Sequence, residues 1–99
     1  MRVRRLETFV SDLTEAYTYL AQRSPASADR LFDSIELLSD LLARFPKSGR
    51  SRPRLGKGVR SFRVRGFPYV ALYRIEPSEV VLLRLWHGAR RLGRKTISG

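Results

Sequence analysis

The chain has 99 residues and a mass of 11.4 kDa, the size of one small domain, and its 42% of apolar residues is typical of a folded protein. It contains no cysteine and one histidine, which excludes disulfides, thiolate metal sites and a histidine-built metal site, so we expect no metal and no cofactor. Of the net charge of +11, residues 1–45 carry −1 and residues 46–99 carry +12, which predicts an anionic partner for the second half.

The sequence gives no indication of a membrane segment or a secretory signal. Even the apolar run 80–83 ends at Arg84, far short of a membrane span. The N-terminal sequence MRVRRLETFVSD has basic residues but no apolar stretch after them, as a secretory signal would require. We therefore expect a cytoplasmic protein without a membrane partner.

The first half of the chain predicts a short strand over residues 2–7 and two helices. From Thr8 the apolar residues follow a helical period, which predicts an amphipathic helix over about 9–23. Ser24 and Pro25 favour a helix start, since serine caps the first turn and proline lacks only an N–H that would be unpaired there. The second helix is predicted over 25–45, with one apolar face formed by Ala28, Leu31, Phe32, Ile35, Leu38, Leu42 and Phe45. Two helices joined by so short a break predict an antiparallel hairpin.

The second half predicts a sheet. Residues 46–58 are rich in Gly, Pro, Ser and cations and are expected to form a surface loop. Strands are predicted over 60–66, 69–76 and 79–87, and their short connections favour an antiparallel meander followed by a basic tail, 88–99. The predicted architecture is a single α+β domain of order β-α-α-β-β-β over residues 1–99, with the helical hairpin on one face of an antiparallel sheet.

Strand alternation predicts what the other face of the sheet carries. If Phe62 and Val64 face the helices, the arginine-bearing positions face away and are left open: Arg63, Arg65, Val70, Leu72, Arg74, Val80, Leu82, Arg84 and Trp86. A one-residue bulge would exchange the faces of a strand. An apolar patch surrounded by guanidinium groups suits an acidic amphipathic segment. The alternative is that the arginine stems only solubilise the strand face.

Three short motifs in the second half carry a resemblance to a known family. They are Phe45-Pro46-x-x-Gly49-Arg50, Phe67-Pro68-Tyr69-Val70-x-x-Tyr73-Arg74 and His87-Gly88-Ala89-Arg90. Their order and spacing resemble ParE-type toxins of the RelE/ParE superfamily, the growth-inhibiting toxin halves of bacterial type II toxin–antitoxin systems, over nearly the whole chain. The resemblance implies a β-α-α-β-β-β fold, a ParD-like ribbon-helix-helix antitoxin with an acidic C-terminal segment, higher-order complexes on operator DNA, and DNA gyrase as the target.

Two groups of residues are expected to bind these partners. The antitoxin is expected on the arginine-rimmed face: Arg63, Arg65, Val70, Leu72, Arg74, Arg84 and Trp86. The target is expected on the basic tail: Arg90, Arg91, Arg94 and Lys95.

The main alternative is catalysis, because the superfamily also contains ribosome-dependent endoribonucleases of the RelE type. RNA cleavage needs a base, an acid and cations at the phosphate, and Arg63, Arg65 and Arg90 match basic positions of these nucleases, with His87 as the proton-transfer group. However, Val70 stands where the nucleases carry arginine, and no good proton donor follows Arg90. We therefore predict a toxin without catalytic residues. A basic nucleic-acid-binding module is a third interpretation, which the lack of basic residues on a recognition helix disfavours.

Overall fold

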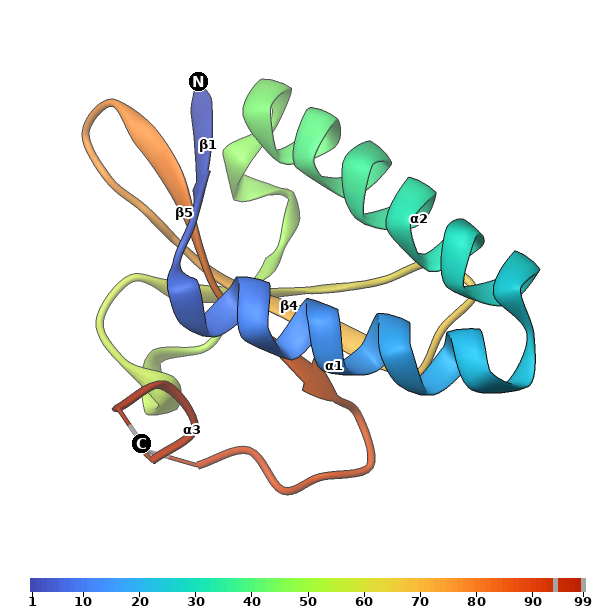
Figure 1. Ribbon diagram of the computed structural model, residues 1–99. Helices are drawn as coiled ribbons and strands as arrows, with labels where there is room; N and C mark the ends of the chain where they lie inside the picture. The colour runs from blue at the N-terminus through green and yellow to red at the C-terminus, as the bar shows by residue number, and fades with distance from the viewer. Residues whose placement is uncertain (94, 99) are drawn as a thin grey trace.

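The computed structural model describes residues 1–93 and 95–98. It confirms the predicted α+β architecture, and adds a short strand, two 3-10 turns and a short C-terminal helix (Figure 1). The elements are β1 (Arg2–Arg5), α1 (Glu7–Arg23), α2 (Pro25–Arg44), η1 (Pro46–Ser48), β2 (Arg50–Ser51), η2 (Pro53–Leu55), β3 (Val59–Arg63), β4 (Tyr69–Ile75), β5 (Glu79–His87) and α3 (Lys95–Ser98).

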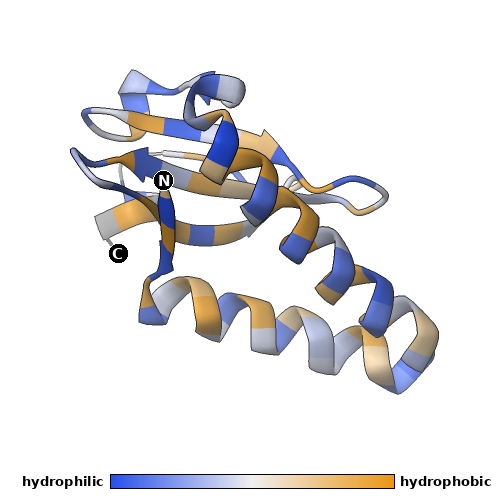
Figure 2. Ribbon diagram, turned by 90° about the horizontal axis from the view of Figure 1, so that it is seen from above, coloured by the Kyte–Doolittle hydropathy of each residue, from blue (hydrophilic) through white to orange (hydrophobic). Residues whose placement is uncertain are grey.

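The two long helices form a hairpin because Ser24 both ends α1 and begins α2. Its backbone N–H donates to Leu20 O at 2.7 Å, and its hydroxyl oxygen accepts from the Ser27 N–H at 3.3 Å. Pro25 occupies the first turn of α2, where its missing N–H leaves no bond unmade. Both helices are amphipathic, as the alternating hydrophobic and hydrophilic bands of Figure 2 show. Within the described part of the chain, neither is apolar enough over a sufficient length to traverse a bilayer.

The sheet has the order β1-β5-β4-β3-β2. The predicted antiparallel meander is present, but β1 pairs with β5 in parallel, from Arg2 opposite Glu79 to Arg5 opposite Leu82. The expectation of a fully antiparallel sheet is therefore wrong at this edge. Almost the whole chain separates β1 from β5, so no tight turn imposes an antiparallel pairing on them.

The larger apolar cluster lies between the helical hairpin and the sheet. Its buried members come from both helices, from β4 and β5, and from Val64 just after β3: Phe9, Leu13, Ala16, Leu31, Ile35, Leu38, Leu42, Val64, Ala71, Tyr73, Val80, Leu82 and Leu85. Phe32 and Phe45, expected on the buried face of the second helix, are instead 46% and 59% exposed. Phe32 lies at the margin of the helical stripe, and Phe45 lies just beyond the end of α2 with a non-helical backbone, so the helix does not direct its side chain toward the sheet.

Strand β5 contains the irregularity that decides which residues face each side. Leu72 lies opposite Arg84, whereas the next residue, Tyr73, lies opposite Leu82, so one extra residue is accommodated in β5. Val80 and Leu82, predicted on the face away from the helices, therefore pack in the helix-side cluster, and Val81 and Leu83 take the other side. The alternation from Arg84 onward was predicted correctly because it lies beyond the bulge.

The face away from the helices, called here the second face, is also covered rather than open. Leu55 of η2 and the C-terminal residues Leu92 and Ile97 pack on it. The buried residues of this second, smaller cluster are Leu55, Val59, Leu72, Val81, Leu83 and Trp86. Figure 1 shows α3 beside the yellow-green loop that contains η2. Sequence reasoning missed this cover because neither segment has a periodic apolar pattern.

Two of the sequence motifs meet at a buried tyrosine of β4. The Tyr73 hydroxyl donates to Pro46 O at 2.6 Å and accepts from the Gly49 N–H at 2.8 Å. A Cβ on Gly49 would lie 2.6 Å from Tyr73 Cε1 and 2.7 Å from Ser61 O, too close for any side chain. Burial raises the pKa of Tyr73 above its ordinary value of 10.0. These motif residues fasten the η1 turn to the sheet.

Candidate functional site

The register of the strands arranges the predicted partner-binding residues in rows across the second face. Arg63 of β3 lies opposite Val70 of β4, and Val70 lies opposite Trp86 of β5. In the next row, Ser61 and Arg84 flank Leu72. The sheet therefore brings most of the predicted set to one face, with arginines at its edges.

Arg84 is engaged within the chain. Its Nε and Nη2 donate to the Asp12 carboxylate at 2.7 and 3.0 Å, and its Nη1 donates to Thr96 O at 2.8 Å. The Arg84 and Asp12 side chains are only 17% and 19% exposed, and the hydrogen bond to Asp12 raises the pKa of Arg84. Arg84 thus joins α1 to the C-terminal segment, and these donors are not available to a partner's carboxylate.

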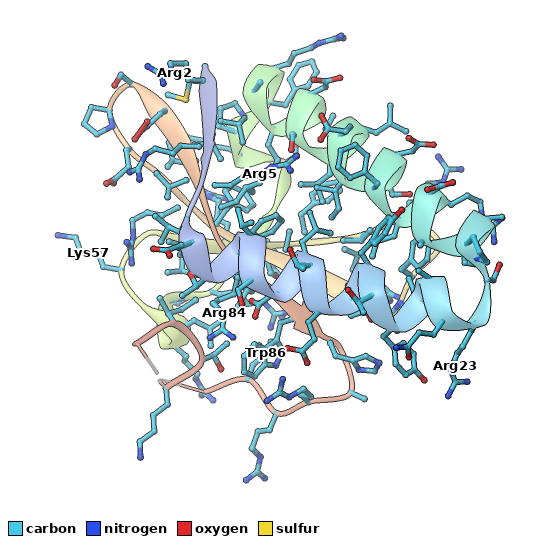
Figure 3. All side chains as sticks on the ribbon, viewed as in Figure 1. Arg2, Arg5, Arg23, Lys57, Arg84 and Trp86 are labelled. Atoms are coloured by element: carbon cyan, nitrogen blue, oxygen red, sulfur yellow. The ribbon has the colours of Figure 1, made fainter. Side chains whose placement is uncertain are left out.

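Trp86 is held between two arginines. The guanidinium carbons of Arg84 and Arg90 lie 5.1 and 4.5 Å from its ring centroid, and its indole N–H donates to Arg90 O at 3.3 Å. Figure 3 shows Arg84 and Trp86 between the sheet and the C-terminal segment. Only 9% of Trp86 is exposed, so its ring is an internal support for the tail with a small accessible edge.

The other predicted residues differ in how accessible they are. Leu72 is fully buried, and Arg74 is half-buried with its Nε donating to Lys57 O at 3.2 Å. Arg63 and Arg65 are exposed, and among residues 1–93 and 95–98 neither guanidinium has an ion-pair partner. Val70 is half-buried between Arg63 and Trp86, whereas Arg65 follows the end of β3, where its carbonyl accepts from Ser34 Oγ of α2 at 3.3 Å. The accessible part of the predicted site is therefore its Arg63 end.

The structure describes three of the four tail residues predicted to contact the target. Arg90, Arg91 and Lys95 are exposed, whereas Arg94 lies outside the described residues. Leu92, after Arg91, packs on the second cluster, and Thr96, after Lys95, is buried, with its hydroxyl accepting from the Gly93 N–H at 2.9 Å. Residues that anchor the tail on the sheet therefore alternate with cations, whose side chains stay exposed.

His87, the proton-transfer candidate of the ribonuclease alternative, lies on the helix side of the sheet. Its ring packs edge-on against Tyr69 at 5.5 Å, and its Nδ1 accepts from the Ala89 N–H at 3.1 Å. It lines a hollow with Arg90 and residues of α1 such as Glu15 and Tyr19. Arg63 and Arg65 do not line that hollow, so the four candidate catalytic residues are not assembled in one site.

Comparison with known proteins identifies the family of this chain. The chain has an α+β fold with a cationic second face, and residues 3–92 match the family model described as "ParE toxin of type II toxin-antitoxin system, parDE". The chain is 33% identical over 100 residues to Toxin ParE3 of Caulobacter vibrioides, covering 96% of this chain and 98% of that protein. It therefore belongs to the ParE family of type II toxins.

Two further relatives extend the comparison. Toxin RelE3 of Caulobacter vibrioides is 35% identical over 81 residues, covering 81% of this chain and 86% of that protein. A solved structure described as the chromosomal ParDE TA system from P. aeruginosa superposes with a TM-score of 0.75 at 23% identity, covering 88% of this chain and 95% of that one. The structural match supports the fold, and relatives named ParE and RelE both occur at similar identity.

Proposed function

We propose that this ParE-family toxin inhibits growth by binding DNA gyrase and stalling its cleaved-DNA intermediate, without catalysis of its own. The observation that carries the proposal is the match to the ParE family model over residues 3–92. The separation of His87 from Arg63 and Arg65 supports a non-enzymatic mechanism, because phosphate cleavage needs the acid, base and cations around one phosphate. The exposed tail cations Arg90, Arg91 and Lys95 are proposed to contact the target complex, as is Arg94 from the sequence alone.

The proposed antitoxin is a ParD-like ribbon-helix-helix protein, whose acidic C-terminal segment covers the second face and which assembles with the toxin on operator DNA. Because Leu72 is buried and Arg84 is bonded to Asp12, the contact set narrows to five residues. They are Arg63, Arg65, Val70, Arg74 and the edge of Trp86. Their guanidinium groups would pair with carboxylates while Val70 offers an apolar contact.

A gyrase supercoiling assay with the purified toxin tests the target. We expect loss of supercoiling together with accumulated linear DNA, and reversal of both when the cognate antitoxin is added. Unaffected gyrase at several-fold molar excess of toxin would contradict the proposal.

The antitoxin site is tested separately by calorimetry. Arg63→Glu should weaken antitoxin binding by about tenfold or more, since like charge then faces the antitoxin carboxylates. Arg30→Glu on α2 makes the same charge change away from the second face and should leave affinity within about threefold. Equal losses in both variants would show a net-charge effect and remove the second face from the proposal.

The ribonuclease function remains a second candidate because His87 and Arg90 line one hollow and relatives named RelE match the chain. A translation-dependent mRNA cleavage assay decides it. Cleavage that is lost in His87→Ala and in Arg90→Ala would replace the gyrase proposal with this one.

A further inference from the structure

The loop around β2 and η2 contacts the C-terminal segment, and the cationic surface that the two segments contribute is called here the basic strip. It is defined by Arg50, Arg52, Arg54, Arg91 and Lys95. The three loop arginines line a hollow that Leu92 closes on one side. Arg91 and Lys95 line the adjoining hollow beside Trp86. Contacts between α3 and η2 bring these segments together although about forty residues separate them in the chain.

In the described part of the chain, no cation of the basic strip takes part in an ion pair. Within residues 1–93 and 95–98 the ion pairs are Arg4–Glu79, Arg5–Glu36 and Arg84–Asp12, and none includes a member of the strip. Four of the five side chains are exposed, and the fifth, Arg52, is held in place by a hydrogen bond from its Nε to Ser61 Oγ at 2.9 Å. The strip is therefore a group of mostly exposed positive charges without ion-pair partners among the described residues, of which Arg52 is held in place.

The chemistry of the strip favours a phosphate backbone over an acidic peptide. An amphipathic peptide needs an accessible apolar groove, but Leu55 is buried here and Leu92 packs inward on the second cluster. Base stacking is also disfavoured, because Arg84 and Arg90 lie over the ring of Trp86. Regularly spaced phosphates remain as the ligand that needs only charge, and contacts of this kind carry no sequence information.

We propose that the basic strip binds the phosphate backbone of duplex DNA, so that the toxin contacts the DNA held by its target as well as the target protein. The choice of DNA rests on the proposed gyrase function, whereas the location of the site rests on the strip itself. Binding is independent of sequence, and it weakens steeply with salt because each neutralised phosphate releases a counterion.

The test measures binding of the purified toxin to a fluorescent 24-base-pair duplex by anisotropy at several salt concentrations. Arg50→Glu/Arg54→Glu removes two exposed cations of the strip, and Arg2→Glu/Arg30→Glu makes the same net charge change on β1 and α2, outside it. We expect the strip variant to lose about tenfold or more in affinity and to lower the salt slope by about 2, with less than about threefold loss in the control. Far-ultraviolet circular dichroism of both variants checks that they are folded.

Several outcomes would overturn the proposal. Equal losses in the two variants would reduce binding to net charge, and no duplex binding by the natural chain at low salt would remove the site. Tighter binding to an RNA duplex of the same length, or to polyglutamate, would replace DNA with that ligand. The assay contains neither gyrase nor antitoxin, so its result can be interpreted even if the gyrase experiment fails. Likewise, a failure to bind duplex DNA does not contradict the proposal that the toxin binds gyrase.

Discussion

The two sides of the sheet are covered by different kinds of structure. On one side, two regular amphipathic helices enclose the larger cluster; on the other, a 3-10 turn and a short C-terminal segment enclose the smaller one. In the described part of the chain these clusters contain thirteen and six buried residues respectively, so the helix side provides most of the apolar stabilisation. The comparison teaches that the layer that supplies most of the stability and the layer that carries the cationic second face are separate parts of this small molecule.

The largest expected effect on stability comes from comparing one substitution in each of the two covers of the sheet. Leu31→Ala on α2 removes a fully buried side chain and should lower the free energy of unfolding by about 2–5 kcal/mol. Ile97→Ala in α3 removes a half-buried side chain and should cost less than about 1 kcal/mol. Urea denaturation of both variants measures the difference. Equal costs would mean that the two covers are equivalent, contrary to this comparison.

The next prediction concerns the side chain that links the two covers. Asp12→Ala leaves Arg84 without its carboxylate and the Leu85 N–H, 3.1 Å from Asp12 Oδ2, without its acceptor. We expect a loss of about 2–3 kcal/mol in the free energy of unfolding, measured in urea. Glu15→Ala, an exposed position on the same helix, is the control and should change stability by less than about 0.5 kcal/mol. A similarly small effect of Asp12→Ala would show that the link is unimportant.

The smallest effect is a pH dependence on the helix side. Because burial raises the pKa of Tyr73 above 10.0, the folded state holds this proton more tightly than the unfolded chain. Its contribution to stability is therefore fully present below pH 10 and is lost as the pH rises through the folded-state pKa. Unfolding curves between pH 9 and 11.5 should show a steeper fall for the natural chain than for Tyr73→Phe. Parallel curves would assign the loss to other tyrosines, since the pKa values of Tyr17 and Tyr69 are also raised.

The helix side could be predicted from the sequence because its signals are local. The helical period of the apolar residues from Phe9, and the helix start at Ser24-Pro25, each depend on residues only a few positions apart in the sequence. Phe32 was misplaced because an apolar residue at the margin of a helical face satisfies the same periodicity whether it is buried or exposed.

The second side could not be predicted to the same extent because its structure depends on contacts between distant segments. The position of the bulge in β5 depends on pairing with β4, and it exchanged the faces of Val80 and Leu82. The partner of Arg84 is Asp12, 72 residues earlier in the chain. Nothing in the spacing of Leu92 and Ile97 indicates that they cover Trp86. The prediction of the arginine face was therefore wrong for Val80 and Leu82, which pack on the helix side, and for the accessibility of Leu72 and Arg84.

The position of β5 inside the sheet affects the order in which this protein can fold. It lies between β1 and β4, and its residues also accept and donate the bonds that hold the start of α1, such as the Thr8 hydroxyl donating to Leu83 O across 75 residues of chain. During synthesis, β1 and α1 emerge first but have no β5 to pair with until almost the entire chain has been made. Closing so long a loop is entropically costly and slows folding. The native second face, with its arginines and tail in place, therefore forms only after β5 and the residues up to Ile97 have been synthesised.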